Sequence, residues 1–415
     1  MHTHRSIPRP SLLATTALLA LLGCGGSNPG PGGGTTITGQ VLDGFAQPLS
    51  GRTVLVGSQS TTSDANGKFT VSGVTTPYDV VLIEPGSGKV ATVYAQLTRT
   101  DPKLRDLGAT STPTRQATLG GNLSGGDALP TPTGTLTGVS WGSPESSTGS
   151  YVTSSPYAFT VAWSGPASIT GSVHALQWTV DPSGTVTGYR SHGVTTGVSL
   201  SSGNVVSNAD LLLAAPLTTN VSGSTNVPGG YTIVDRTVYL TFDDGAFFPV
   251  SSDGISNPSF DLPVPSGIGA SAQINVTAGD GGTQTSAQLS GVAPGTTGLA
   301  LTLPAPALAT TPADGATGVD TGTDLVWSPV PNAVYLVILN GGSSDPTYIV
   351  VTGGARARIP DLTAQGLGLP SGRVYDWGLI AVGPSPGIDA FTATGVFPRE
   401  GFGFQTVSST QFTTR

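Results

Sequence analysis

Apolar and polar positions alternate in short segments along this chain, and turn residues separate the segments about every 8 to 12 residues. The first such segments are rich in β-branched residues: TITGQVL (36–42), RTVLVG (52–57), KFTVSGV (68–74), YDVVLIE (78–84) and KVATVYAQL (89–97). No helical period appears, and the best helix candidate, Ala209 to Ala215, is too short to count. The pattern predicts an all-β protein made of tandem β-sandwiches set in a row.

The first folded unit is expected over residues 36–107. Within it, Asp64-Ala65-Asn66-Gly67 predicts a turn, since Gly accepts a positive φ and Asp bonds to its own backbone. Phe69 and Val71 follow at alternate positions, which predicts that both point into a core.

This unit resembles the carboxypeptidase regulatory-like domain, a transthyretin-type sandwich of bacterial surface proteins. The resemblance is carried by eight positions: Gly39, Val41, Pro48, Leu49, Asp64, Gly67, Phe69 and Val71. It implies a non-catalytic stalk or docking module.

The middle of the chain contains a diverged repeat, with one copy over residues 115–215 and the other over 216–304. PYAFTVAWSGPASITGSVHALQWT (156–179) corresponds to PSFDLPVPSGIGASAQINVTA (258–278). SLSSGNVVSNADLLL (199–213) corresponds in the same order to QLSGVAPGTTGLALTL (288–303). Both copies share the strand pattern of the first unit, so we expect two further transthyretin-like sandwiches.

The last unit is expected over residues 305–415. TTPADGATGVDTGTDLVWSPVPNAVYLVILNG resembles the opening of a fibronectin type III or related Ig-like domain. The resemblance makes Trp327 the core tryptophan of the second strand, with Tyr335 and Val337 on the third. Further on, one strand face carries Tyr375, Trp377, Leu379 and Ala381. A buried aromatic ladder is the expected use of that face, and ligand contact is the alternative.

The N-terminus has the form of a secretory signal. Arg5 and Arg9 precede an apolar run over about residues 12–22, which is too short to span a membrane. Leu21-Leu22-Gly23-Cys24 then resembles the bacterial lipobox, which implies cleavage of residues 1–23 and lipidation of Cys24. The alternative is an ordinary signal with an incidental cysteine. Residues 24–35 would be the anchor and a flexible Gly/Pro tether.

Charge and position restrict the partners. Loss of the signal removes two arginines and no acid, so the net charge falls from −8 to −10, and only 10% of residues are charged. An acidic, charge-poor surface argues against nucleic acid and against anionic lipid headgroups as partners. The partners expected are the membrane, reached through the lipid anchor, and an envelope protein or a polysaccharide. Gly25 follows Cys24 where some bacteria use Asp to retain a lipoprotein in the inner membrane, so the outer membrane or cell surface is favoured.

The sequence predicts no enzyme. Gly138-Val139-Ser140-Trp141-Gly142 fits G-x-S-x-G, but the nucleophile elbow needs a helix after the serine, and a Gly/Ser-rich loop follows here. Only His174 and His192 in the mature chain could act as base.

Neither a metal site nor a cofactor is expected. Two histidines and no second cysteine cannot make a structural zinc site without several carboxylates. Calcium is the hypothesis raised by the clusters Asp243-Asp244-Gly245, Asp253-Gly254, Asp280-Gly281 and Asp314 with Asp320 and Asp324. None has the order of an EF-hand loop, and Asp and Gly are also ordinary turn residues.

Three aromatic rings are the candidates for ligand contact. Phe247 and Phe248 lie in the expected loop DDGAFFPV, and Trp141 lies in the G-x-S-x-G segment. Such contact requires rings left in solvent; tucking into the fold is the alternative.

Together these features predict a non-catalytic lipoprotein of the cell envelope that acts in binding, adhesion or scaffolding. Two alternatives stay open. One is a secreted glycan-binding or glycan-active protein with accessory sandwiches, and the other is a purely mechanical spacer.

Overall fold

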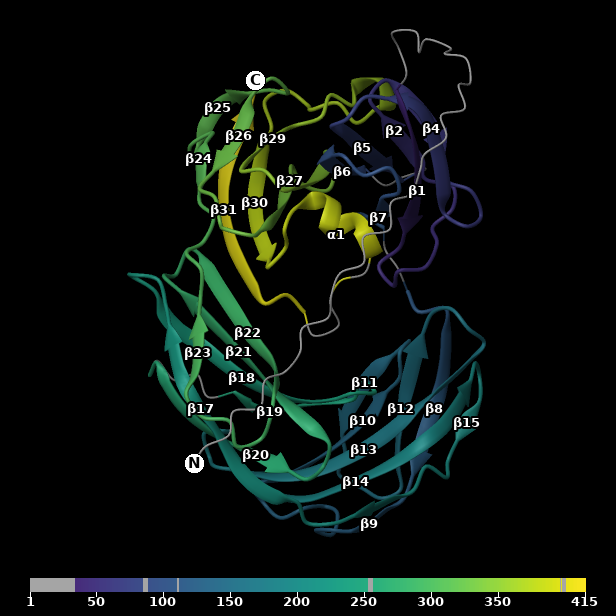
Figure 1. The fold of residues 1–415 in the computed structure, drawn as a ribbon, viewed down its shortest axis with the longest axis vertical. Coiled ribbons are helices and arrows are strands. Elements are labelled where there is room, and N and C mark those ends of the chain that lie inside the picture. Colours follow the sequence, from purple (N-terminus) through teal and green to yellow (C-terminus); the bar gives the residue numbers. More distant parts are fainter. Residues whose placement is uncertain (1–33, 85–88, 110–111, 253–256, 396, 398–400) are drawn as a thin grey trace, which may run out of the picture.

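The computed structural model describes residues 34–84, 89–109, 112–252, 257–395, 397 and 401–415, and nearly every regular element among them is a strand (Figure 1). The all-β prediction is confirmed. Cys24, the signal segment and residues 24–33 of the tether lie outside the described residues. Within the described ranges, no helix has the length and apolar character needed to cross a membrane.

The first unit is a sandwich of two sheets, with strand orders β4-β1-β7 and β3-β2-β5-β6. Its strands are β1 (Thr35–Leu42), β2 (Thr53–Val56), β3 (Gln59–Thr62), β4 (Lys68–Val74), β5 (Tyr78–Ile83), β6 (Val90–Leu97) and β7 (Lys103–Arg105). The predicted turn is present, since the Asp64 carboxylate accepts N–H bonds from Asn66 and Lys68 and Gly67 has a φ of 70°. Phe69 and Val71 are buried, as predicted.

The same strand order recurs in the second unit, with sheets β12-β8-β15 and β11-β10-β13-β14 and an added pair β16-β9. Its strands are β8 (Arg115–Gly121), β9 (Leu123–Gly125), β10 (Thr135–Gly142), β11 (Ser147–Tyr151), β12 (Tyr157–Trp163), β13 (Ser168–Val180), β14 (Val186–Ser201), β15 (Val205–Val206) and β16 (Leu211–Leu213). The stretch Ala209 to Ala215 thus contains a strand.

The third unit repeats that order as β20-β17-β23 and β19-β18-β21-β22. Its strands are β17 (Leu217–Asn226), β18 (Thr232–Phe242), β19 (Phe247–Ser252), β20 (Ser259–Ser266), β21 (Ala270–Gly279), β22 (Gln284–Val292) and β23 (Leu299–Thr302). The opening strands β1, β8 and β17 each pair with one antiparallel and one parallel neighbour. The corresponding segments 156–179 and 258–278 fall on equivalent strand pairs, β12–β13 and β20–β21.

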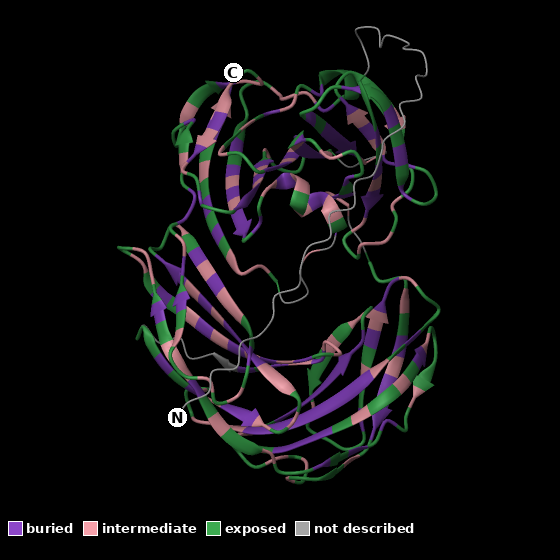
Figure 2. Ribbon diagram, viewed as in Figure 1, coloured by how far each residue is buried: buried purple, intermediate pink, exposed green. Residues whose placement is uncertain are grey.

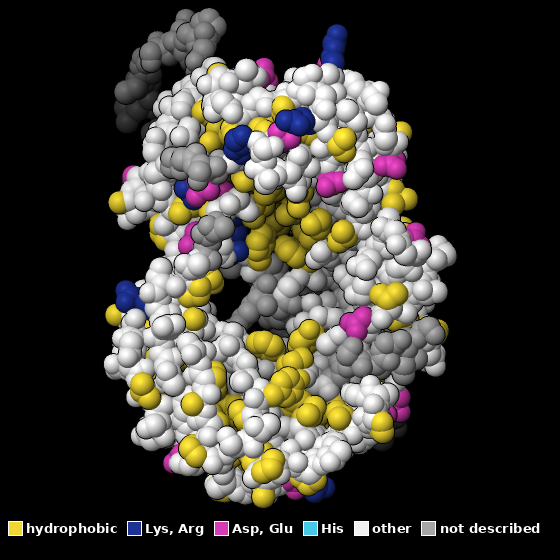
Figure 3. Space-filling view, turned by 180° about the vertical axis from the view of Figure 1, so that it is seen from behind, with side chains coloured by type: hydrophobic (Ala, Val, Ile, Leu, Met, Phe, Trp, Pro, Cys, Tyr) yellow, Lys and Arg dark blue, Asp and Glu magenta, His cyan; other side chains and the backbone are white. Residues whose placement is uncertain are grey.

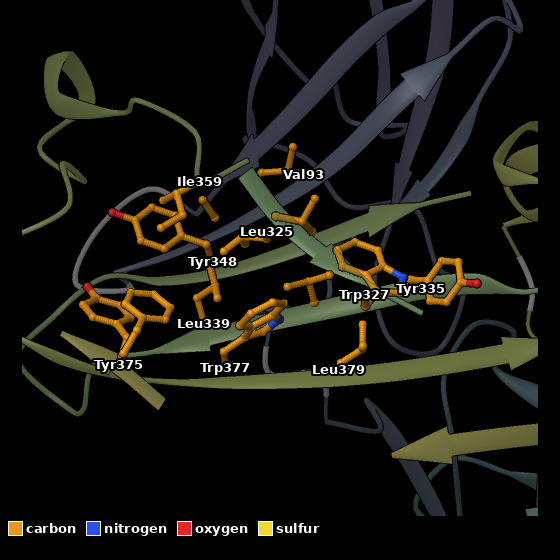
Figure 4. Close-up of a cluster of buried hydrophobic side chains, with 14 of the residues drawn as sticks. Val93, Leu325, Trp327, Tyr335, Leu339, Tyr348, Ile359, Tyr375, Trp377 and Leu379 are labelled. Atoms are coloured by element: carbon orange, nitrogen blue, oxygen red, sulfur yellow. The ribbon is translucent and has the colours of Figure 1, made fainter. Parts of the chain in front are cut away.

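The last unit packs the sheet β24-β26-β29 on the strands β28-β27-β30-β31, with β25 beside β31. Its strands are β24 (Ala309–Thr311), β25 (Ala316–Val319), β26 (Asp324–Trp327), β27 (Val334–Asn340), β28 (Thr347–Thr352), β29 (Arg356–Arg358), β30 (Val374–Gly383) and β31 (Phe404–Thr414). Trp327, Tyr335 and Trp377 are all buried and pack together (Figure 4). The prediction of a buried ladder is confirmed, because Tyr375, Leu379 and Ala381 are buried with them.

One helix was not predicted. The helix α1 (Ile388–Thr394) has seven residues, too few for a helical period to be visible in sequence. Backbone N–H groups of Thr98 and Arg99, in the first unit, donate to the Asp389 carboxylate of α1. The helix therefore connects the last unit to the first.

The four units do not form the expected row, because the last one closes onto the first (Figure 1). Strands β6 and β28 pair in parallel over Val90–Tyr94 and Thr347–Val351. Strands β22 and β31 join the third unit to the last, so one sheet runs from β19 through to β3. An edge strand has unpaired backbone N–H and C=O groups, so edge strands of two different units can pair with each other.

Burial follows the strands in alternating bands (Figure 2). Seen from behind, the molecule is hollowed between its two pairs of units, and hydrophobic side chains gather on the walls of the hollow (Figure 3). Strands β11 and β19 lie side by side in the lower pair, where the second unit meets the third.

Candidate binding groove between the second and third units

The outer face of the second unit is buried against the third. Leu176, Trp178 and Tyr189 project from β13 and β14 into one apolar cluster with Leu240 and Phe248 of the third unit. The Tyr189 hydroxyl also donates to the Pro263 carbonyl at 3.2 Å. Because the two units share a core, the joint between them is rigid enough to hold a site.

The glycines of the G-x-S-x-G segment allow the second and third units to approach each other closely. Gly138, Ser140 and Gly142 occupy alternate positions of β10 and so face the third unit together. A Cβ atom on Gly142 would lie 2.2 Å from the Ala246 backbone nitrogen, and one on Gly138 would lie 3.1 Å from the Phe248 ring. The motif is thus explained by close approach of the turn between β18 and β19.

Ser140 itself does not sit in a nucleophile elbow. It lies within β10, is fully buried, and accepts the Phe247 N–H at 3.0 Å through its hydroxyl oxygen. An elbow would expose the hydroxyl at a strand-to-helix turn. Both ring nitrogens of His174 are also engaged elsewhere, as described below.

Two of the three predicted contact rings are not available, and these predictions were wrong. Trp141 is 0% exposed, because alternation along β10 turns it into the core of the second unit while Ser140 faces out. Phe248 is 2% exposed, because its position in β19, opposite Leu240 in β18, turns it inward. Strand β19 occupies what sequence suggested was a loop.

Phe247 is the predicted ring that borders open space. It is partly exposed on the opposite face of β19 and lines a small apolar cavity of about 110 Å³. The other side chains in this cavity wall include Tyr151, Trp178, Phe248 and Pro249.

Tyr151 is the main residue that sequence reasoning missed. It is 58% exposed at the end of β11, and its ring lies 5.8 Å from that of Trp178 at an angle of 48°. The available signal was a lone aromatic residue in the Ser/Thr/Gly-rich segment STGSY.

A second, larger cavity of about 560 Å³ adjoins the first, and Phe247 lines both. Its wall carries four hydroxyl side chains, Ser147, Thr241, Ser271 and Ser290, beside the rings of Phe242 and Phe247, and Asp243 is its one charged residue. We call the two cavities together the junction groove. Of the residues that the structure describes, no Lys, Arg or His lines it.

The backbone of β19 beside the groove is already paired with the second unit. Besides the bond to Ser140, the Ser147 hydroxyl donates to the Gly245 carbonyl, and the Tyr151 hydroxyl donates to the Pro249 carbonyl at 3.4 Å. Pro249 has no N–H to offer. The groove therefore presents side chains rather than a free strand edge.

A buried polar cluster lies in the same joint. His174 Nε2 is 2.8 Å from Asp244 Oδ2, and His174 Nδ1 is 3.3 Å from His192 Nε2. Both imidazoles pack on the Phe242 ring, with centroids 4.0 Å and 5.6 Å away. Both histidines lie well inside their strands, His174 in β13 and His192 in β14.

Burial sets the charge state of this cluster. It lowers the pKa of His192 to about 4, helped by the neighbouring His174. Burial also lowers the pKa of His174, although Asp244 opposes the effect. For Asp244, burial raises the pKa, but hydrogen bonds from His174 and the Ala246 N–H outweigh it and the pKa is lowered.

Two of the Asp-Gly clusters contain Asp-capped turns, whereas Asp324 lies in β26 and accepts a hydrogen bond from Arg358. Asp280 accepts the N–H groups of Gly282 and Thr283, and Asp320 accepts that of Gly322. The cluster Asp253-Gly254 lies outside the described residues. Among the residues that are described, no three acidic, histidine or cysteine side chains converge as a metal site would require.

No known protein family matches the chain. No curated protein matches it either.

Among solved structures, the Bacillus anthracis TIE protein is 9% identical with a TM-score of 0.16, over 65% of this chain and 50% of that one. A streptococcal ancillary pilin is 13% identical with a TM-score of 0.15, over 62% of this chain and 91% of that one. The pilus adhesin SpaC from Lactobacillus rhamnosus GG is 10% identical with a TM-score of 0.13, over 76% of this chain and 42% of that one. This chain therefore spans about half of the first of these proteins. Likenesses this slight assign neither a fold family nor a function.

Proposed function

We propose that this protein is a non-catalytic binding protein of the cell envelope that acts in adhesion or scaffolding, and that it holds its partner in the junction groove. The observation that carries the proposal is the exposed Tyr151 ring, set beside the buried Trp178 and next to Phe247 at the joint of two units. Exposed aromatic rings in a preformed concave site are typical of binding surfaces.

The build of the joint supports this function. Both walls of the groove rest on one shared core, so its rings are held in place before a partner arrives. Preorganisation of this kind lowers the entropic cost of binding. The serine, the histidines and the acid in the joint are engaged in hydrogen bonds to one another and to backbone, which supports a structural role for them.

We further propose that Cys24 is lipidated after removal of residues 1–23, and that residues 24–35 tether the folded units to the outer membrane or cell surface. The lipobox-like Leu21-Leu22-Gly23-Cys24 supports this anchor. Two or three acyl chains hold a protein at a membrane where a single chain does not. The first unit is proposed as a carboxypeptidase regulatory-like domain and the last as a fibronectin type III or Ig-like domain.

A purely mechanical spacer is the weaker candidate. Tandem units make a spacer by adding their lengths, but pairing of β6 with β28 folds the last unit back onto the first. A closed arrangement of this kind is shorter and more rigid than a linear one.

A capture experiment tests the proposal. Residues 34–415 would be immobilised, and an envelope extract of the source organism passed over the wild type, Tyr151→Ser and Leu212→Ser. Leu212 is a matched control because it is apolar, 74% exposed and not part of the groove. A component retained by the wild type and Leu212→Ser but lost with Tyr151→Ser is the expected result. Empty columns with folded protein would overturn the proposed function.

A further inference from the structure

We propose that the junction groove binds an uncharged oligosaccharide, with one sugar ring against Tyr151 and Phe247 and the next in the larger cavity, whose lining includes four hydroxyl side chains. This inference rests on the proposed function, because it names the class of ligand for the same groove. Four features of the groove support it.

The charge of the groove favours a neutral ligand. Among the described residues, its lining has no cationic side chain that could pair with a phosphate, a sulfate or an acidic sugar. Its one carboxylate, Asp243, is exposed and would repel an anion, whereas it can accept hydrogen bonds from sugar hydroxyls. A single exposed carboxylate is screened by salt and gives little attraction to a cation.

The size of the apolar cavity favours one ring. An engineered cavity of about 150 Å³ holds a benzene molecule, and pockets that enclose whole drug-sized ligands measure about 300–1,000 Å³. At about 110 Å³, the cavity beside Tyr151 takes a single ring in part and leaves the rest of the ligand outside. A bulky apolar ligand would remain largely exposed to solvent in this cavity.

The groove offers both of the surfaces that a sugar ring needs, aromatic rings and hydroxyl groups. The C–H face of a sugar ring packs on an aromatic face, whose quadrupole is negative, and Tyr151 offers such a face to solvent. Sugar hydroxyls need hydrogen-bonding partners, and Ser147, Thr241 and Ser271 supply them in the adjoining cavity. Because Phe247 lines both cavities, a chain of at least two sugars would cross its ring.

The edge of β19 disfavours an extended peptide. Peptides that add to a sheet edge bind mainly through backbone hydrogen bonds. Here the Phe247 N–H and the Gly245 and Pro249 carbonyls are paired with side chains of the second unit, and Pro249 lacks an N–H. Recognition therefore falls to side chains, and those present are aromatic rings and hydroxyls.

A glycan array tests this inference directly. The array would carry neutral hexasaccharides of glucose, galactose, mannose and N-acetylglucosamine in α and β linkage, an acidic galacturonate hexasaccharide, and a proline decapeptide. We expect residues 34–415 to bind at least one neutral member and neither of the other two probes. Titration calorimetry of that member should show an affinity at least about tenfold lower for Tyr151→Ala, which is the loss of about 1.4 kcal/mol.

Two variants separate the ring from other effects. Tyr151→Phe keeps the aromatic face and should bind within about threefold of the wild type, and Leu212→Ser should bind as the wild type does. Binding that survives Tyr151→Ala, or an array on which no neutral member is retained, would overturn the inference. Retention of the proline peptide in place of a glycan would do the same.

The two proposals fail in different ways. If the array stays empty while the capture column retains a component that depends on Tyr151, the binding function stands and the glycan class is wrong. If both the array and the column stay empty, the proposed function fails as well.

Discussion

His174 and His192, 18 residues apart in sequence, meet in the joint between the second and third units with Nδ1 and Nε2 at 3.3 Å. Because His174 Nε2 donates to the Asp244 carboxylate, His174 Nδ1 accepts, and His192 Nε2 must be the donor. A proton on His174 reverses the direction of the His–His bond without breaking it. Protons on both imidazoles leave no acceptor between them, and the bond is lost.

The first prediction is that the free energy of unfolding decreases as the pH is lowered below about 6.5. His192 has a pKa of about 4 in the folded protein against the ordinary 6.5, so the unfolded chain takes up its proton first. The contribution of neutral His192 to stability is fully present above about pH 6.5. It is lost as the pH falls toward 4, and the loss amounts to about 3 kcal/mol in all. His174 adds to the loss in the same direction, since its pKa is also lowered. Urea denaturation at about pH 7.5 and about pH 5 measures it.

The matched control is His192→Gln, whose amide N–H can still donate to His174 Nδ1 but does not titrate. We expect a smaller fall in stability with this variant over the same pH interval. No other histidine follows the signal segment, so the comparison is clean. Equal pH dependence in wild type and variant would show that the pair does not govern the acid limb.

The second prediction contrasts two neighbouring rings. Phe248→Ala should lower the free energy of unfolding by about 3 kcal/mol or more, because the ring is buried in the core shared by two units. Phe247→Ala should lower it by less than about 1 kcal/mol, because that ring is half-exposed on the opposite face. Thermal or urea unfolding of the two variants decides it. Similar losses would mean that the alternation of β19 is wrong.

Sequence patterns predicted the parts of the fold in which local rules decide. Phe69 and Val71 could be assigned to a core from alternation, and the turn before them from the bonding habits of Asp and Gly. Trp377 followed in the same way, since large aromatic residues at alternate positions fit a buried sheet face, whereas Trp327 and Tyr335 were assigned to a core through the resemblance to a fibronectin type III or Ig-like domain.

The rest depended on which faces meet, and period-2 alternation does not determine that. Both faces of β10 are buried, one by its own sandwich and the other by the third unit, so Trp141 could not be distinguished from an exposed ring. For the same reason, sequence did not predict the His174–His192–Asp244 cluster, which joins β13 and β14 to the turn between β18 and β19. Tyr151 lies at the joint because β11 ends beside β19, a contact between two units that no local pattern indicates.

The third prediction concerns the G-x-S-x-G segment as a packing motif. Gly142→Ala should weaken the joint and lower stability by about 1–3 kcal/mol, because the new methyl group meets the Ala246 backbone at 2.2 Å. Gly188→Ala, in β14, is the matched control, since its nearest neighbour would be 3.6 Å away. Both glycines lie within strands of the second unit. If Gly142→Ala unfolds at the same urea concentration as the control, the close approach does not exist in solution.

The fourth prediction concerns the anchor. Cys24→Ser removes the thiol that would carry the diacylglycerol, so we expect the full chain to leave the membrane fraction and appear in the periplasm or the medium. Fractionation and intact-mass measurement of the purified chain test it. Wild-type protein without added acyl mass, or a variant that stays in the membrane fraction, would refute the lipoprotein assignment.

The fifth prediction is that the first and last units unfold together. Val93 belongs to the first unit but is buried in the core of the last, in one cluster with Trp327 and Trp377. Val93→Ala should lower stability by about 2 kcal/mol. The first unit contains no tryptophan, so fluorescence reports on the other units. We expect its midpoint in urea to fall together with the midpoint seen by circular dichroism.

Thr70→Ala is the control for this measurement, because Thr70 belongs to the first unit but is exposed on β4. It should move neither midpoint. Independent units would behave differently: Val93→Ala would shift part of the circular dichroism signal and leave the fluorescence transition in place. The parallel pairing of β6 with β28 makes that outcome the unexpected one, since unfolding the first unit alone would strip β28 of its neighbour and expose Val93's partners to water.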